Sequence, residues 1–171
     1  MTVEKNTMYP HQLHKIKQLY YDPSGAVISQ FEANPESKEY EACSFLLNNK
    51  KVIYRQAKIT PTKTGQFVTI WKRNAAGITA PFDSEDAIDF FIITVQDNEL
   101  LGQFIFPRKV LSAKGIITHN NKGGKRGMRV YPPWNTVTSK QALVTQNWQA
   151  AYFYELLPEG TTVMDRIITL F

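Results

Sequence analysis

Residues Trp71–Lys109, WKRNAAGITAPFDSEDAIDFFIITVQDNELLGQFIFPRK, contain the two apolar runs that decide the fold. The runs are Ile88–Val95 and Leu100–Phe106, and the polar turn Gln96–Glu99 separates them. Each run is short and rich in Phe, Ile, Thr and Val, which favours a strand over a helix. Nearly continuous apolar residues are typical of strands that are buried on both faces. The stretch therefore predicts a buried hairpin at the centre of a sheet.

Weaker patterns place further elements on both sides of this hairpin. Helices are predicted over residues 8–20, from Pro35 to about residue 49, and from Thr138 or Ser139 to about Tyr154. Strands are predicted over residues 26–31 and 128–131, together with a long hairpin of residues 50–59 and 66–73, and residues 111–116 are predicted to be a turn that leads into a short strand. The pattern for residues 165–171 does not decide between helix and strand. The chain is predicted to be a single α/β domain over residues 1–171, with a mixed sheet flanked by helices.

Length and composition narrow the classes of protein that the chain can belong to. A chain of 171 residues fits one domain, and no apolar run reaches the roughly 18–20 residues that cross a bilayer. The first ten residues lack the apolar core of a signal peptide, and a single cysteine, Cys43, excludes an internal disulfide. We therefore expect a cytoplasmic protein that does not associate with membranes. Three His and one Cys do not make a zinc site.

The positive charge is concentrated in two segments of the chain. The net charge is +5, and residues 50–73 and 108–154 contain Lys and Arg without any acidic residue. Such segregation predicts a cationic face and a polyanionic partner, namely nucleic acid, with DNA favoured over RNA. The alternative is a basic surface that contacts only solvent.

Candidate phosphate-binding residues come from the predicted long hairpin and from the glycine-rich loop HNNKGGKRG at residues 119–127. The loop lacks the first Gly and the Ser/Thr of a P-loop, but its glycines let backbone N–H groups approach an anion. Trp134 follows the loop and can stack on a base, although packing against the protein is the favoured interpretation. The candidates are Lys58, Lys63, Lys72, Arg73, Lys109, Lys125, Arg126, Arg129 and Trp134.

Acidic residues before the first apolar run suggest a catalytic metal site that is incomplete. Nucleases of the restriction-endonuclease type place an Asp at the start of one strand and (D/E)-x-K on the next, so that carboxylates hold magnesium beside a lysine. Asp83 and Asp89 are the candidate metal ligands, and magnesium is the only cofactor that the pattern suggests. The matching position of the next run holds Gln103, without carboxylate or lysine. Lys58 could act as the lysine of the site together with Asp83, Asp89 and Gln103. It could instead act with Gln56, two positions before it, which offers only an uncharged amide oxygen as a ligand. Glu41 is a further carboxylate that could contribute.

Several longer motifs resemble those of the MepB family, a group of bacterial proteins. They cover nearly the whole chain: Lys58–Arg73, Ala80–Asp83, Asp89–Phe90, Gly102–Pro107, Lys114–Ile116, Gly123–Gly127, Arg129–Trp134 and Gln146–Gln149. The resemblance implies a cytoplasmic protein with a restriction-endonuclease-like fold, and it assigns no catalytic residues. Together with the charge pattern, it leads us to expect a nucleic-acid-binding protein with a degenerate catalytic site. The alternatives are an active magnesium-dependent nuclease and a protein that binds or processes free nucleotides or other anionic small molecules.

Overall fold

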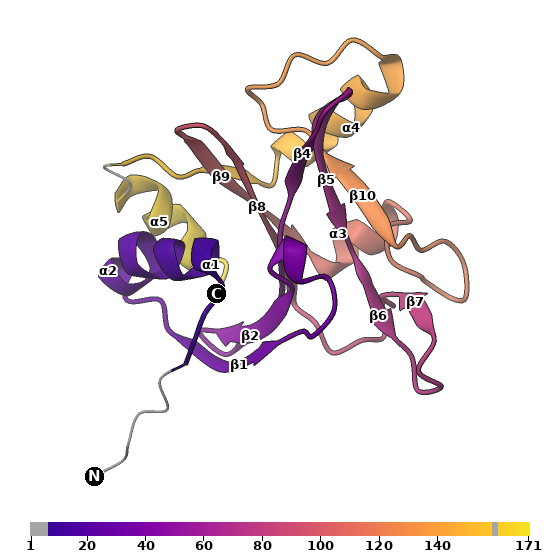
Figure 1. Ribbon diagram of the computed structural model, residues 1–171, viewed down its shortest axis with the longest axis horizontal. Helices are drawn as coiled ribbons and strands as arrows, with labels where there is room; N and C mark the ends of the chain where they lie inside the picture. Colours follow the sequence, from indigo (N-terminus) through magenta and orange to yellow (C-terminus); the bar gives the residue numbers. More distant parts are fainter. Residues whose placement is uncertain (1–6, 159–160) are drawn as a thin grey trace.

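A mixed sheet of six strands forms the centre of the molecule (Figure 1). The computed structural model describes residues 7–158 and 161–171. In spatial order the strands are β1 (Ile28–Ala33), β2 (Cys43–Leu47), β3 (Lys50–Gln56), β8 (Phe90–Asp97), β9 (Leu100–Pro107) and β11 (Phe153–Glu155). Neighbouring strands are antiparallel except β3 and β8, which run parallel at the centre.

The central hairpin predicted from the two apolar runs is confirmed as β8 and β9. Phe91 pairs with Phe106 and Ile93 pairs with Phe104, so that the large side chains of both strands share a face. The turn between the strands contains Asn98 with a φ of 52°, in the left-handed region that Asn tolerates better than most residues. Both strands are buried along most of their length, in agreement with their continuous apolar sequence.

A second, smaller sheet takes two strands from the chain between β3 and β8 and a third from the chain after β9. Its order is β10 (Gly127–Val130), β5 (Lys63–Thr69) and β4 (Lys58–Thr60), and β6 (Trp71–Arg73) and β7 (Thr79–Pro81) form a separate hairpin. The long hairpin predicted over residues 50–73 is therefore wrong in its first half. Strand β3 belongs to the large sheet, and the chain changes sheets at Ala57, whose N–H donates to Thr94 O at 2.9 Å.

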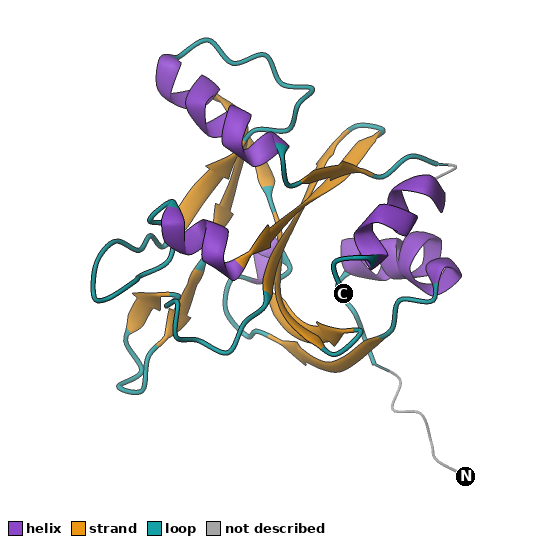
Figure 2. Cartoon of the chain, turned by 180° about the vertical axis from the view of Figure 1, so that it is seen from behind, coloured by secondary structure: helices purple, strands orange, loops and turns teal. Residues whose placement is uncertain are grey.

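Helices lie on both sides of the six-stranded sheet (Figures 1 and 2). One side has α1 (His11–Ile16), a π-helical turn η1 (Lys17–Tyr21), α2 (Asp22–Ser24) and α5 (Thr161–Ile168). The other side has α3 (Arg108–Ala113) and α4 (Lys140–Ala150), and a 3-10 turn, η2 (Lys38–Tyr40), precedes β2. The predicted fold class, a mixed α/β architecture with helices flanking the sheet, is confirmed. Within the described ranges, no helix is long and apolar enough to cross a membrane.

Each face of the large sheet has its own hydrophobic core. On the first face, Leu13 and Ile16 of α1 and Met164 of α5 pack against the sheet. On the second face, Val68 of β5 and Leu111 of α3 pack against the other side of the same strands. The two cores fix the small sheet, α3 and α4 on one side of the molecule and the α1–α2 and α5 helices on the other.

The helix predicted from Pro35 to residue 49 is wrong, because this segment contains β2. Cys43, Phe45 and Leu47 are buried, whereas Ser44 and Leu46 between them are only partly buried. This period of two is the pattern of a strand, and it outweighs the helix-start signal of Pro35.

Smaller differences concern the remaining elements. The first helical segment extends to Ser24, and Gly25 ends it with a φ of 83°. Residues 108–113 form helix α3 rather than part of a turn and strand, and residues 161–168 form α5. The predicted helix after Ser139 is confirmed as α4, although it ends at Ala150 and a short strand, β11, follows.

Candidate nucleic-acid interface

Helix α4 and the small sheet enclose a polar hollow that contains cations and no acid. The hollow has a volume of about 350 Å³, and its cations are Lys114, Lys125 and Arg129. A second hollow of about 220 Å³ continues from Arg129 to Lys63 on β5, again without a carboxylate. We call Lys63, Lys114, Lys125 and Arg129, with the α4 residues between them, the α4 face. Hydroxyl and amide groups of α4 and of its N-cap contribute to the lining: Ser139, Gln141 and Thr145.

Backbone hydrogen bonds bring two of these cations together from separate segments. Gly124 N donates to Gly115 O at 3.1 Å, and Lys125 N donates to Ile116 O at 2.8 Å. The glycine-rich loop therefore lies against the segment after α3, and Lys114 lines the same hollow as Lys125. Sequence reasoning missed the proximity of Lys114 and Lys125, because eleven positions separate them in the chain (125 − 114).

The four cations differ in how firmly the protein holds them. Arg129 is fixed, because Nη1 donates to Thr64 O at 3.2 Å and Nη2 donates to Thr60 Oγ1 at 2.7 Å. The Lys114 ammonium lies 5.4 Å from the centroid of the Trp148 ring. Among the described residues, Lys63 and Lys125 have no hydrogen-bond or ion-pair partner for their ammonium groups. These exposed ammonium groups can approach a phosphate without first breaking a contact within the protein.

Two glutamine side chains hold α4 against the edge of the small sheet. Gln149 is fully buried; its Oε1 accepts from Tyr131 N at 2.8 Å, and its Nε2 donates to Arg129 O at 2.9 Å. One turn earlier, Gln146 Nε2 donates to Pro132 O and Asn135 O at 3.0 and 2.9 Å. The Gln149 amide thus pairs with the backbone N–H and C=O groups at the free edge of β10, as a neighbouring strand would. Sequence reasoning missed this role, because a glutamine on a helix is ordinarily exposed.

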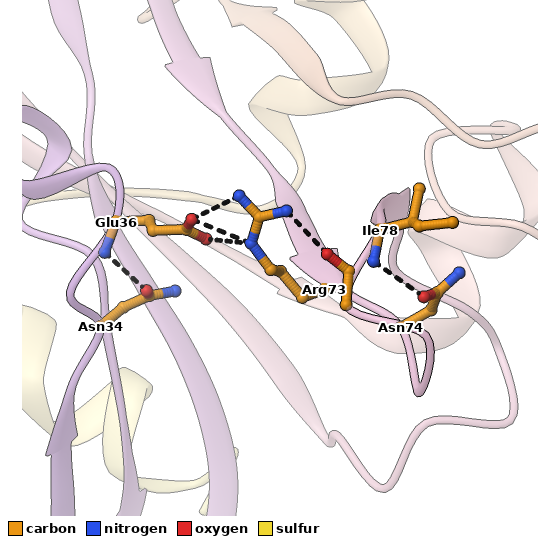
Figure 3. Close-up of polar contacts among 6 residues, drawn as sticks. Asn34, Glu36, Arg73, Asn74 and Ile78 are labelled. Atoms are coloured by element: carbon orange, nitrogen blue, oxygen red, sulfur yellow. Dashed lines mark hydrogen bonds and ion pairs between the residues drawn. The ribbon is translucent and has the colours of Figure 1, made fainter.

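The other predicted phosphate contacts lie elsewhere or are already engaged. Lys72 forms an ion pair with Asp86 at 2.6 Å, and Arg73 forms one with Glu36 at 2.6 Å and donates to Gly77 O (Figure 3). The hydrogen bonds with Glu36 and its charge raise the pKa of Arg73. Both cations belong to strand β6, and Figures 1 and 2 show the β6–β7 hairpin at the opposite end of the molecule from α4. They do not belong to the α4 face.

Four further candidates also lie outside the lining of these two hollows. Arg126 donates to Thr79 O at 3.0 Å, and exposed Lys109 belongs to α3. Lys58 is in register with Phe67 and Arg129 across the small sheet, and its ammonium lies 5.3 Å from the Tyr40 ring centroid. Trp134 packs edge-to-face on Phe153 with the ring centroids 5.5 Å apart, which agrees with the packing interpretation.

The structure does not bring the predicted catalytic residues to one point. Asp89 precedes β8, and its Oδ2 accepts from Lys51 N at 2.8 Å. Gln103 pairs with Thr94, five positions further along β8, which corresponds to roughly 17 Å at about 3.3–3.4 Å per residue. Gln103 also points to the face of the large sheet opposite to that of Asp89, because its partner Thr94 is an odd number of positions from Asp89. There its side chain is fully buried, and its Oε1 accepts from Tyr21 Oη at 3.0 Å.

Two further carboxylates of the predicted metal site accept hydrogen bonds from backbone N–H groups. Asp83 Oδ1 accepts from Glu85 N at 2.9 Å within its own turn, and Glu41 Oε1 accepts from Gln12 N at 2.7 Å. Gln56 pairs with Thr94, which places Gln56 and Lys58 away from the Asp89 end of the sheet. In the parts of the chain that the structure describes, no group of three His, Cys, Asp or Glu side chains is arranged to hold a metal ion.

Comparison with known proteins establishes the family. The model of the MepB-like family matches residues 34–155. The chain belongs to the MepB-like family. The matched region includes β2 to β11 and α4, and hence all four cations of the α4 face.

A solved structure of similar fold covers most of this chain. The crystal structure of MepB has 36% sequence identity with a TM-score of 0.74, and the alignment covers 86% of this chain and 97% of that one. The structure of a bacterial homing endonuclease, I-Ssp6803I, has 13% identity and a TM-score of 0.43, covering 82% of this chain and 87% of that one. A search of curated proteins gave no match.

Proposed function

We propose that this chain is a cytoplasmic nucleic-acid-binding protein that contacts phosphates through the α4 face. The observation that carries the proposal is the pair of adjoining hollows lined by Lys63, Lys114, Lys125 and Arg129 without a carboxylate. Phosphate contacts by Lys and Arg supply most of the affinity of non-specific nucleic-acid binding. DNA is the proposed partner, and RNA is the competing ligand in the test below.

The chemistry of the α4 face suits the sugar-phosphate backbone rather than base sequence. The hydroxyl groups of Ser139 and Thr145 and the amide of Gln141 can hydrogen-bond to phosphate or sugar oxygens. Trp148 is partly buried and already contacts both Phe106 and Lys114, so its ring is not a free stacking platform. We therefore expect low sequence specificity and binding that requires no metal ion.

The test is the salt dependence of binding, measured by fluorescence anisotropy on labelled single- and double-stranded DNA and RNA. Each lost phosphate contact lowers the slope of log affinity against log salt by about 0.9 for duplex DNA and about 0.7 for single strands. Replacing Lys63, Lys114 and Lys125 by Ala should therefore weaken binding and flatten the slope by about 2–3 units. Arg129 is left in place because it connects β10 to β4 and β5.

A control variant changes the same number of charges on other parts of the molecule. Lys15 of α1, Lys50 at the start of β3 and Arg166 of α5 are exposed, and their replacement by Ala should leave the slope nearly unchanged. Equal losses in the two triple variants would mean that only net charge matters, and the α4 face would not be the interface. EDTA should not alter the affinity.

A further inference from the structure

A buried arginine on the large sheet lacks a negatively charged partner. Arg55 of β3 is only 3% exposed, and its Nη1 donates to Tyr54 O at 2.8 Å. Its Nε is buried without a hydrogen-bond partner, and no carboxylate of the described residues forms an ion pair with it. A buried charge without a partner is costly, and ionisable groups perturbed by burial cluster at functional sites.

Arg55 carries its charge at neutral pH although it is buried. Burial lowers its pKa to about 10, which leaves the guanidinium protonated. The nearby Cys43 thiol does not neutralise it, because burial raises the pKa of Cys43 to about 12. Arg55 therefore retains an unneutralised positive charge inside the protein.

Arg55 lines a cleft of about 630 Å³, within the range of small-molecule sites. Strand register places Glu32, Ser44 and Ile53 side by side across β1, β2 and β3. Arg55 follows Ile53 by two positions and points to the same face. Trp71 and Phe82, from β6 and the segment after β7, form an apolar wall of the cleft.

Ion pairs join the walls of the cleft and leave Arg55 as its unpaired cation. The Glu36 and Arg73 side chains that line it form the ion pair shown in Figure 3, which connects the loop before β2 to β6. Lys72 is paired with Asp86. Among the described residues that line the cleft, the charges without an ion-pair partner are thus Arg55, which is buried, and Glu32, which is exposed on β1.

We propose that this cleft binds a small molecule whose phosphate or carboxylate group pairs with Arg55. The guanidinium has N–H groups free to donate to two oxygens of one anion, which is the geometry that Arg provides and Lys does not. The Ser44 hydroxyl, which accepts from Lys51 Nζ at 3.3 Å, lies on the same face. Trp71 and Phe82 cover the apolar body of the ligand, and Glu32 at the outer end accepts from its hydroxyl or amino groups. This site is separate from the α4 face and does not depend on nucleic-acid binding.

The experiment is isothermal titration of the full chain with inorganic phosphate, AMP and L-glutamate. We expect at least one of the three to bind with a Kd of about 1 mM or tighter, and Arg55→Gln to weaken it by roughly tenfold or more, as loss of a charge-assisted hydrogen bond does. Binding of phosphate or AMP alone would identify a phosphate ligand, and binding of L-glutamate alone would identify a carboxylate ligand. Absence of binding by all three would overturn the proposal.

Further variants separate a binding role of Arg55 from a structural one. Ser44→Phe places a ring in the cleft while Arg55 remains, and it should abolish binding even if Arg55→Gln fails to fold. Arg166→Gln removes one charge on α5 and should bind as the wild type does. The Lys63, Lys114 and Lys125 triple variant should also retain this binding, so that failure of the α4 face and failure of the cleft give different results. Unchanged affinity in folded Ser44→Phe would contradict the assigned location.

Discussion

The glutamine that joins α4 to the small sheet gives the sharpest prediction about stability. In Gln149→Leu the side-chain volume is nearly conserved, but Tyr131 N–H and Arg129 C=O lose their partners. Each lost hydrogen bond costs about 1–1.5 kcal/mol, and more where the remaining group stays buried, so we expect a loss of about 2–4 kcal/mol. For a chain of this length that lowers Tm by roughly 5–15 °C.

Urea unfolding followed by circular dichroism measures this loss, with Gln141→Leu as the control. Gln141 is exposed on the same helix, so its replacement should change stability by no more than about 0.5 kcal/mol. A loss below about 1 kcal/mol in Gln149→Leu would refute the reasoning, because it would mean that water replaces both hydrogen bonds. Since α4 supplies part of the α4 face, Gln149→Leu should also weaken DNA binding although every lysine is retained.

Three further predictions concern packing and pH. Gly102→Ala should destabilise the protein by about 1–3 kcal/mol in thermal unfolding, because the added Cβ would overlap the Phe153 ring, and Phe153→Leu should restore part of the loss. Trp148→Ala should lower the free energy of unfolding by about 2–3 kcal/mol, because the ring is partly buried against Phe106. An unchanged melting temperature together with lost DNA binding would show that the packing assignment is wrong. Burial raises the pKa of Glu41 above its ordinary 4.5, so the folded state binds the proton more tightly and its stability falls as pH rises through that raised pKa. Glu41→Gln should therefore be more stable than the wild type at pH 7, and melting between pH 4 and 7 should show the difference vanish toward acid; a constant difference would contradict the assignment.

The fold was predictable where one local signal dominated. The short, continuous apolar runs of β8 and β9 are typical of strands that are buried on both faces. The Ser139 hydroxyl marks the start of α4, because it accepts from Ala142 N at 3.1 Å as an N-cap. The β2 segment was misassigned because Pro35 gives a helix-start signal close to a short alternating pattern. The split between β3 and β4 was not predictable, because no Gly or Pro marks Ala57, where the chain changes sheets.

The site was predictable in composition but not in arrangement. The acid-free segments of the sequence identify Lys63, Lys125 and Arg129 as candidate phosphate contacts. They could not show the contribution of Lys114 to the same hollow, which depends on hydrogen bonds between two loops. Nor could they show that Arg55, one cation among several, is buried without a counter-charge.

The parallel pairing of β3 with β8 bears on the order in which the chain folds. Residues in this pair are separated by 38 positions, as for Val52 and Phe90 (90 − 52), and the intervening chain contains most of the small sheet. The β8–β9 and β2–β3 hairpins close short turns and have little chain entropy to overcome, whereas the central parallel pair must close a long loop. We expect both hairpins to form early and β10, about sixty positions after its partner β5, to join late. In pulse-labelled hydrogen exchange, the amides of β8 and β9 should gain protection before those of β5 and β10, and simultaneous protection would exclude this order.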